Sequence, residues 1–243
     1  MDDSETPTPA PGQPTTDRVK KIFETIAPKY DLFNILSSFG IDRLWRRSTV
    51  KYAGITSRSV VLDLAAGTGD LTMAIARQGR PKSILSTDFV SEMLEVGKRK
   101  AAEYTGPTKI DFEVVDAQSL PFDDAAFDVV TIAFGVRNLP DRAANFREVR
   151  RVLKPGGRYV ILEFSKPPFP PFRRLYHFYL KTVIPALGGL LTGDRPSFAY
   201  LNESIRAFPS QINLAAELHA AGFERVAWHN LTFGIVAVHI AQG

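Results

Sequence analysis

Short apolar runs alternate with amphipathic segments along the middle of the chain, and this pattern predicts strands that alternate with helices. Five runs have the length of buried strands: residues 60–64, 83–87, 110–115, 127–133 and 159–164. Between them, apolar residues recur at helical spacing, and Asp141 is placed to cap one of these helices. Such alternation with short connections is typical of an α/β fold with a parallel sheet covered on both faces.

The end of the chain follows a different pattern. Ser210 is placed to cap a helix that ends at Gly222, and two apolar runs follow at 223–228 and 233–240. Because the link between these runs is short, we predict an antiparallel hairpin that completes the sheet. A turn is also predicted at 155–157, directly before the fifth strand.

Three other segments fall outside the alternation. Residues 1–17 contain four acidic residues and four prolines, which predicts a disordered tail. Residues 18–55 begin with a helical apolar face that includes Val19 and Ile26, and they predict an N-terminal helical cap. Residues 166–209 begin with a proline-rich run to Phe172 that disfavours helix and strand alike. We predict that this insertion forms a substrate lid over the carboxyl ends of the strands, where open α/β sheets bind ligands.

Composition narrows the class of protein. Of 243 residues, 44% are hydrophobic and 23% are charged, which excludes a wholly disordered, collagen-like or coiled-coil chain. The absence of cysteine excludes disulfides and thiolate chemistry, and the four histidines lack metal-binding spacing, so we expect no metal site. A net charge of +4 suits a surface that meets a membrane or an anionic ligand, and we expect no nucleic-acid partner.

The sequence also indicates where in the cell the protein is expected. The start of the chain does not resemble a secretory signal, and the uncharged segment 182–193 is too short to cross a bilayer. We therefore expect a cytoplasmic protein, either soluble or at the inner face of the membrane.

A glycine turn after the first strand is the strongest local sign of a binding site. In the run from Ala65 to Asp70, Gly67 and Gly69 allow a sharp turn, and the following helix offers free N–H groups. A dinucleotide fingerprint would need a third glycine where Thr72 stands, and Asp70 would repel a pyrophosphate. A ligand with a small carboxylate and a cationic centre fits better, and an ordinary tight turn is the alternative.

Acidic residues stand at the ends of three successive strands. They are Asp63, Asp88 and Asp116, and Ala117 follows the last of them. Asp88 is placed to accept hydrogen bonds from ribose hydroxyls, although a helix cap is an alternative role. Together the three acids predict an acidic crescent suited to S-adenosylmethionine, whose sulfonium and ammonium groups are positive.

The segment from Asp63 to Thr72 resembles the S-adenosylmethionine motif of the menaquinone/ubiquinone biosynthesis C-methyltransferases. Further blocks match this family: F-G-V-R-N at 134–138, R-V-L-K-P-G-G at 151–157, L-E-F-S-K-P at 162–167, Y-L-N-E-S-I-R at 200–206, A-G-F at 221–223 and N-L-T-F-G-I-V at 230–236. The resemblance extends from about Val19 to Ala241. The glycine turn and R-V-L-K-P-G-G occur widely in class I methyltransferases, whereas F-G-V-R-N, L-E-F-S-K-P and S-I-R are more specific.

The resemblance implies a class I methyltransferase (Rossmann-like) fold, with a seven-stranded, mostly parallel sheet of order 3-2-1-4-5-7-6. It implies a single methyltransferase domain over residues 18–243, with S-adenosylmethionine as cofactor. The residues implied to bind it are Ala65, Gly67, Thr68, Gly69, Asp88, Asp116, Ala117 and Ala133. Some relatives carry serine where this chain has Ala133, so only a backbone contact is expected there.

The resemblance also implies an activity, the transfer of a methyl group to a ring carbon of demethylmenaquinol, which gives menaquinol. This carbon becomes nucleophilic when a ring hydroxyl loses its proton, so the partner is a reduced, prenylated naphthoquinol. Arg137 would stabilise the phenolate, and Asn138 and Asp116 would orient a water that takes the proton. A helix-capping or salt-bridging pair is the alternative role for Arg137 and Asn138, and His177 is a second candidate base.

Several alternatives remain at this point. The acceptor is alternatively a benzoquinol of the ubiquinone pathway, alone or in addition. A nicotinamide-dependent oxidoreductase is disfavoured by Thr72 and by the lack of a Tyr-x-x-x-Lys pair, and a non-catalytic, lipid-associated assembly protein stays open. Arg173, Arg174 and Lys181 of the insertion predict transient contact with a membrane surface, but packing for stability or a homodimer explains the segment equally well.

Overall fold

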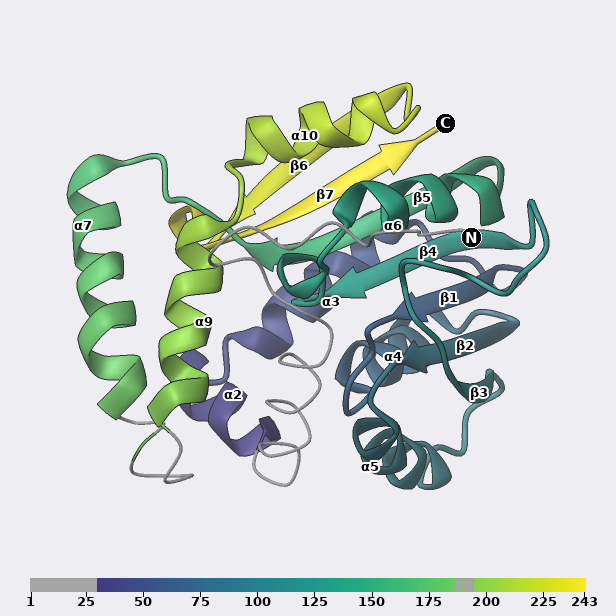
Figure 1. The fold of residues 1–243 in the computed structure, drawn as a ribbon. Helices are drawn as coiled ribbons and strands as arrows, with labels where there is room; N and C mark the ends of the chain where they lie inside the picture. Colours follow the sequence, from purple (N-terminus) through teal and green to yellow (C-terminus); the bar gives the residue numbers. More distant parts are fainter. Residues whose placement is uncertain (1–29, 187–188, 190–194) are drawn as a thin grey trace, which may run out of the picture.

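The computed structural model describes residues 30–186, 189 and 195–243, which form a seven-stranded sheet with helices on both faces (Figure 1). The strands are β1 (Val60–Leu64), β2 (Ser83–Asp88), β3 (Lys109–Val114), β4 (Phe127–Ala133), β5 (Leu153–Phe164), β6 (Arg225–Leu231) and β7 (Val236–Gln242). Their order is β3-β2-β1-β4-β5-β7-β6. Strands β1 to β5 pair in parallel, and β7 pairs antiparallel with β5 and β6. The predicted strand order and terminal hairpin are confirmed.

The helices follow the predicted alternation with the strands. They are α2 (Tyr30–Ser38), α3 (Asp42–Ala53), α4 (Asp70–Ala74) with the π-helical turn η2 (Ile75–Gly79), α5 (Ser91–Ala102), the 3₁₀ turn η3 (Val136–Asn138), α6 (Arg142–Val152), α7 (Pro170–Phe178) with the π-helical turn η4 (Tyr179–Val183), α9 (Arg195–Ala207), α10 (Gln211–Ala220) and the 3₁₀ turn η5 (Thr232–Gly234). Both predicted caps are confirmed, since Asp141 and Ser210 accept hydrogen bonds from backbone N–H groups of α6 and α10. The predicted tail and the helical face around Val19 lie outside the described residues.

Two apolar cores lie on opposite faces of the sheet, because successive side chains of a strand point to opposite sides. Val61 belongs to the core beneath α3 and α4, whereas Leu62 and Leu64 belong to the core beneath α6 and α10. In α3, Trp45, Val50 and Ala53 are buried against the sheet. The second half of the predicted N-terminal cap therefore covers one face of the sheet.

Two predictions about prolines are wrong. The structure has β5 starting at Leu153, before the predicted turn at 155–157. Phe127 pairs with Leu153 and Val129 pairs with Arg158, so the extra residues of β5 form a bulge. The run that was expected to exclude a helix instead contains the start of α7 at Pro170. A proline is tolerated there because the first N–H groups of a helix have no partner within it.

Helices α7 and α9 lie side by side, with α2 next to them, at the end of the molecule away from β3 (Figure 1). Tyr176, Leu180 and Ile184 of the segment after β5 form a separate apolar cluster with Ile205 of α9, and this cluster packs against Phe164 at the end of β5. The described part of the 166–209 insertion therefore lies beside the carboxyl end of a parallel strand. Within the residues that the structure describes, no helix is both long enough and apolar enough to span a membrane.

Candidate functional site

A narrow cavity of about 60 Å³ lies at the carboxyl ends of β1, β2, β3 and β4. Seven of the ten predicted site residues line it: Ala65, Gly67, Asp88, Asp116, Ala117, Ala133 and Asn138. They come together because the carboxyl ends of neighbouring parallel strands lie at the same edge of the sheet. Thr68, Gly69 and Arg137 do not line this cavity.

The glycine turn is built around two left-handed glycines, Gly67 at φ +57° and Gly69 at φ +78°. A Cβ on Gly69 would lie 3.3 Å from the Cα of Gly97, so this glycine allows α4 and α5 to approach each other. The hydroxyl of Thr68, between them, donates a hydrogen bond to the carboxylate of Asp31 in α2 (2.6 Å). Thr68 and Gly69 therefore shape the turn, while Gly67 faces the cavity.

Asp88 connects this turn to the next helix. Its Oδ2 accepts a hydrogen bond from the N–H of Gly67 (2.8 Å), and its Oδ1 accepts one from the N–H of Val90 (2.9 Å). The residue is only 7% exposed, and burial raises the pKa of its carboxyl to about 6. Asp88 acts as a backbone cap and also lines the cavity, so these two roles do not exclude each other.

Only two of the three acids that were predicted to form an acidic crescent line the smaller cavity. Asp116 is exposed and lines the cavity, and its Oδ1 accepts a hydrogen bond from the N–H of Gln118 (2.9 Å). Asp63 lines neither cavity, because its side chain is fully buried and accepts hydrogen bonds from the hydroxyls of Thr72 and Thr131 (2.6 Å each). Its place one residue before the end of β1 points it into the protein. Burial also raises the pKa of the Asp63 carboxyl to about 6.

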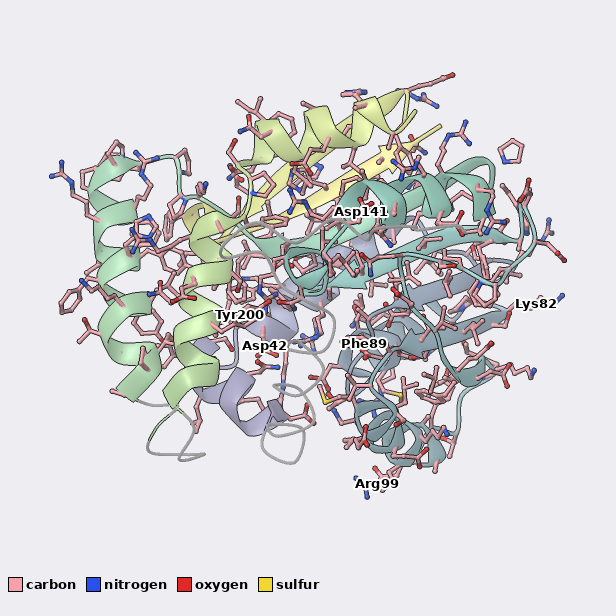
Figure 2. All side chains as sticks on the ribbon, viewed as in Figure 1. Asp42, Lys82, Phe89, Arg99, Asp141 and Tyr200 are labelled. Atoms are coloured by element: carbon pink, nitrogen blue, oxygen red, sulfur yellow. The ribbon has the colours of Figure 1, made fainter. Side chains whose placement is uncertain are left out.

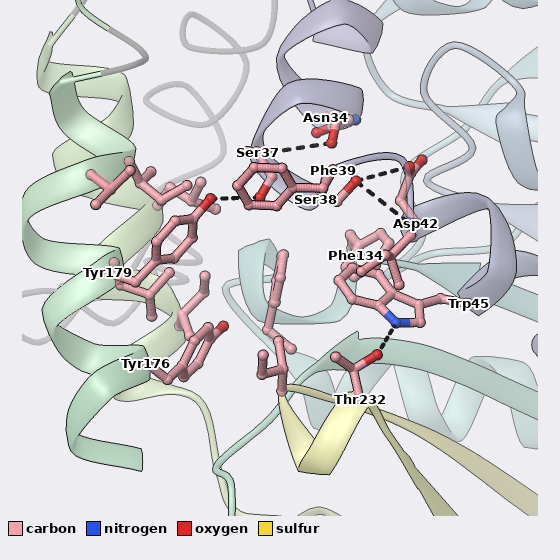
Figure 3. A pocket seen from close by; sticks show the side chains of 18 of the residues that line it. Asn34, Ser37, Ser38, Phe39, Asp42, Trp45, Phe134, Tyr176, Tyr179 and Thr232 are labelled. Atoms are coloured by element: carbon pink, nitrogen blue, oxygen red, sulfur yellow. Dashed lines mark hydrogen bonds between the residues drawn. The ribbon is translucent and has the colours of Figure 1, made fainter. Parts of the chain in front are cut away.

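A second, larger cavity of about 490 Å³ lies between the sheet and α2, α3, α7 and α9 (Figure 3). Two of its lining residues, Asp42 and Tyr200, are labelled in Figure 2. Most of its lining residues are aromatic or aliphatic, and this volume is in the usual range for small-molecule sites. Two hydrogen bonds join its walls across long stretches of sequence. The hydroxyl of Tyr179 donates to the carbonyl of Ser37 (2.7 Å), and the indole of Trp45 donates to the hydroxyl of Thr232 (2.7 Å) (Figure 3).

The F-G-V-R-N block separates the two cavities. Phe134 lines both of them and holds a left-handed backbone at φ +57°, which is unusual for a bulky residue. Asn138 lines the smaller cavity, and its Oδ1 accepts a hydrogen bond from the hydroxyl of Tyr200, which lines the larger one (3.2 Å). The two cavities therefore share a wall of one aromatic ring and one amide.

Arg137 lines the larger cavity and is nearly fully buried. Its Nη1 lies 3.0 Å from Oε1 of Glu163, whose side chain is 1% exposed. Burial raises the pKa of the Glu163 carboxyl, while the charge of Arg137 opposes that rise. The predicted salt-bridging role of Arg137 is therefore present, together with a place at the cavity wall.

The remaining catalytic candidates are distributed between the cavities. Asp116 lines the smaller cavity and Arg137 the larger, so the water predicted to join them would have to lie near Asn138. His177 lines neither cavity; burial and the charges of Arg206, Arg173 and Lys166 lower its pKa. Sequence reasoning missed the contributions of Ser38, Asp42 and Thr232 to the larger cavity. The one available signal was the aromatic and basic stretch around Trp45.

Comparisons with known proteins agree with this geometry. The model of the ubiE/COQ5 methyltransferase family matches residues 13–243. A ubiquinone/menaquinone biosynthesis C-methyltransferase UbiE from Geotalea daltonii is 44% identical over 227 residues, which cover 93% of this chain and 96% of the relative. The protein of the same name from Stutzerimonas stutzeri is 44% identical over 230 residues, which cover 94% of this chain and 90% of the relative.

Solved structures with lower identity share the fold. A SAM-dependent methyltransferase from Thermotoga maritima aligns with a TM-score of 0.65 at 19% identity, covering 91% of this chain and 98% of that one. A methyltransferase solved with the Trm112 activator from Haloferax volcanii aligns with a TM-score of 0.64 at 17% identity. The alignment covers 90% of this chain and 96% of that one. The chain therefore belongs to the ubiE/COQ5 methyltransferase family, and it is a C-methyltransferase that uses S-adenosylmethionine.

Proposed function

We propose that this enzyme methylates a ring carbon of demethylmenaquinol and so forms menaquinol, in the last step of menaquinone biosynthesis. The observation that supports this best is the larger cavity, which is apolar and carries the buried Arg137–Glu163 pair. Apolar walls suit a bicyclic aromatic ring and the first part of a prenyl chain, and a fixed cation suits a ring oxygen that becomes negative. The names of the relatives include both ubiquinone and menaquinone, so a benzoquinol is the second candidate acceptor.

The smaller cavity is proposed as the donor site. When bound, S-adenosylmethionine supplies an electrophilic methyl group on a sulfonium centre. The residues present fit this group: Asp88 offers a buried carboxylate to ribose hydroxyls, and Asp116 and Ala117 offer backbone to adenine. Ala133 offers a backbone contact, and Gly67 lets the ligand approach the main chain.

The proposed chemistry at the acceptor depends on Arg137. A guanidinium has too high a pKa to act as a base, so its role is to stabilise the phenolate that forms when a ring hydroxyl loses its proton. Glu163 holds the guanidinium in place, and Asn138 and Asp116 orient the water that takes the proton. The apolar walls keep other water away from the carbon that reacts.

The acceptor is tested with the purified protein, S-adenosylmethionine and one of two substrates, demethylmenaquinol or the corresponding benzoquinol. Mass spectrometry of the products is expected to show a methylated naphthoquinol, and no product from the oxidised quinone. Methylation of the benzoquinol alone would establish the second candidate instead. Binding of S-adenosylhomocysteine without methylation of either quinol would support a non-catalytic protein.

Replacement of Asp88 by asparagine is expected to weaken binding of S-adenosylhomocysteine by about 10- to 100-fold, as for the loss of a hydrogen bond to a charged group. Because the pKa of Asp88 is about 6, the affinity of the wild type should increase as the pH rises from about 5 to about 7 and the carboxyl ionises. Titration calorimetry over this pH range measures both effects.

A control variant separates Asp88 from the other buried acid of similar pKa. Asp63→Asn should retain the pH dependence, because Asp63 does not line the cavity. Equal affinity and equal pH dependence in Asp88→Asn and the wild type would show that Asp88 only caps the backbone.

We also propose that the mouth of the larger cavity contacts an anionic lipid bilayer. Five large apolar side chains are exposed in segments that contribute residues to the wall of this cavity: Phe39, Phe169, Leu175, Phe178 and Phe233. Three of these, Phe39, Leu175 and Phe178, line the cavity as well. Exposed aromatic residues at a cavity mouth favour a lipid interface, where a prenyl chain would remain while the ring enters the protein.

Charge and backbone strain support a bilayer as the partner. Arg174 and Lys181 are exposed on the same segment, and residues 166–186 contain no acidic residue. Thr232 and Phe233 both have left-handed backbones, at φ +47° and +55°, and Phe233 is 80% exposed. Such strain costs free energy, and here it holds an aromatic ring in solvent beside Phe172. Basic residues beside an exposed apolar rim match anionic headgroups.

Vesicle sedimentation tests this contact. The double variant Phe169→Ser/Phe233→Ser, which changes no cavity-lining residue, is expected to bind phosphatidylglycerol vesicles at least about tenfold more weakly than the wild type, because it removes two large apolar side chains. Ile212→Ser, at a similarly exposed position in α10, is the matched control. Unchanged vesicle binding in the double variant would contradict the proposal. A change in oligomeric state instead would identify the rim as a contact between two copies of the chain.

A further inference from the structure

We infer that Arg46 is a second group that binds the ring oxygens of the quinol, in addition to Arg137. The inference rests on the proposed function of the larger cavity. Three buried polar atoms on its lining side chains have no hydrogen-bond partner: Nε of Arg46, Nε of Arg137 and the hydroxyl of Tyr176. The other buried atoms without a partner among the described residues belong to His177, Asn202 and His239, which line neither cavity.

Unpartnered buried donors point to a ligand. Buried polar groups are almost always hydrogen-bonded, and an orphaned one costs free energy unless a ligand or water completes it. The Nε–H of arginine can only donate, so the missing partner has to be an acceptor atom. The side chains of Arg46 and Arg137 are 8% and 5% exposed, and the cavity around them is apolar. An aromatic molecule with two oxygens fits this combination better than a hydrocarbon does.

Arg46 is fixed by two carboxylates that leave its Nε free. Its Nη1 pairs with Asp42, one turn earlier in α3, and its Nη2 lies 3.5 Å from Asp70 at the start of α4. Asp42 is itself buried and accepts a hydrogen bond from the hydroxyl of Ser38 (2.9 Å) (Figure 3). Both ends of the guanidinium fork are therefore occupied by protein acids, and only Nε lacks a partner.

Phe134 and Phe164 are neighbouring rings in the cavity wall, tilted by 41° to each other, and each arginine lies over one of them. We call this pair of rings the aromatic floor. Cζ of Arg46 lies 5.8 Å from the ring centre of Phe134, and Cζ of Arg137 lies 5.4 Å from that of Phe164. The centres of these two rings are 4.9 Å apart. A hydroquinol carries its two oxygens at opposite ends of one ring, so a ring lying on this floor would present one oxygen to each arginine.

The position of the proposed donor site indicates which arginine binds which ring oxygen of the quinol. Both arginines line only the larger, acceptor cavity, but Arg137 is next to Asn138, which lines the smaller, donor cavity. Nη1 of Arg137 also donates a hydrogen bond to the carbonyl of Phe134, a residue that lines both cavities. We therefore infer that Arg137 binds the ring oxygen beside the carbon that is methylated. Arg46 then binds the second ring oxygen, which is para to the first. Arg46 is then a specificity residue, which favours a hydroquinol over a phenol with one hydroxyl.

Two acceptors test this assignment in the holoenzyme: demethylmenaquinol, and an analogue that keeps the hydroxyl beside the reacting carbon but has hydrogen in place of the other. The variant Asp42→Asn/Arg46→Met removes the charged pair together, so no buried charge is left alone. We expect it to lower kcat/KM for the quinol by about 10- to 100-fold, and to change kcat/KM for the analogue by less than about threefold. The conservative variant Arg46→Lys lacks the Nε–H group, so it should show the same pattern as the double variant. Its kcat/KM should fall for the quinol and change little for the analogue without the second hydroxyl.

A binding measurement makes the test independent of turnover. Trp45 lines the cavity, so in a Trp228→Phe background it is the remaining tryptophan, and an oxidised quinone should quench its fluorescence. We expect the dissociation constant of the quinone to rise at least about tenfold in both Arg46 variants. Equal losses of kcat/KM on the two acceptors, with unchanged quinone binding, would overturn the inference. Failure of the wild type to methylate either acceptor would overturn the proposed function instead.

Discussion

Arg137→Lys is expected to lower kcat by about 100- to 1000-fold, which is the range for losing one preorganised donor to a developing negative charge. Lysine keeps the positive charge beside Glu163, but it does not reproduce the planar guanidinium, whose Nη1 bonds Glu163 while the side chain lines the cavity. The dissociation constant of S-adenosylhomocysteine should stay nearly unchanged, because Arg137 does not line the smaller cavity, which we propose as the donor site. Steady-state kinetics with demethylmenaquinol and calorimetry with S-adenosylhomocysteine measure the two quantities.

Arg142→Lys provides the matched control for this experiment. Arg142 also pairs with a glutamate, Glu217, at 3.0 Å, but it lines neither cavity and is about one-third exposed. We expect kcat of this variant to equal that of the wild type. A normal kcat in Arg137→Lys, or a loss of donor binding as large as the loss of turnover, would contradict the assigned role.

Glu163→Ala is expected to lower the free energy of unfolding by about 3–5 kcal/mol, because it leaves the charge of Arg137 buried without its partner. Urea denaturation followed by circular dichroism measures this quantity. The double variant Arg137→Met/Glu163→Leu should recover most of the lost stability, since replacing both partners of a buried pair with apolar residues is often neutral. It should remain inactive.

An ion pair that is about one-third exposed gives the comparison for this effect. Glu217→Ala removes the partner of Arg142 and should cost no more than about 1 kcal/mol, because water screens and solvates the remaining charge. A loss in Glu163→Ala as small as that in Glu217→Ala would mean that the buried pair contributes little to the fold. The two variants therefore separate the contribution of burial to the free energy of unfolding from the contribution of charge pairing.

The sheet could be predicted from sequence because its signals are local. The run 127–133 coincides with β4, and Asp141 and Ser210 cap the helices at which they were placed. The strand order came from the resemblance, since pairing depends on contacts between distant segments. The bulge at 155–157 escaped prediction because a Pro-Gly-Gly run is typical of a turn, and only the register with β4 shows that the strand continues.

The candidate donor site was predictable for a similar reason. Residues such as Gly67, Asp88 and Ala117 lie at or just after the ends of strands, and the parallel sheet brings strand ends together. Asp63 shows the limit of this rule, because one position within a strand decides whether a side chain faces a cavity or the core. The larger cavity depends on packing between α3 and segments more than a hundred residues away, as in the Trp45–Thr232 hydrogen bond. The aromatic and basic stretch around Trp45 is the one local signal, and it does not indicate which distant segments Arg46 would face.

A crystal structure of the enzyme with S-adenosylhomocysteine and an oxidised naphthoquinone acceptor tests the central claim most directly. We predict the ribose at Asp88 and the quinone ring on the floor of Phe134 and Phe164, with one ring oxygen at Arg137. The ring carbon beside that oxygen should face the sulfur atom. Density for the quinone outside the larger cavity, or for the ribose away from Asp88, would contradict the account.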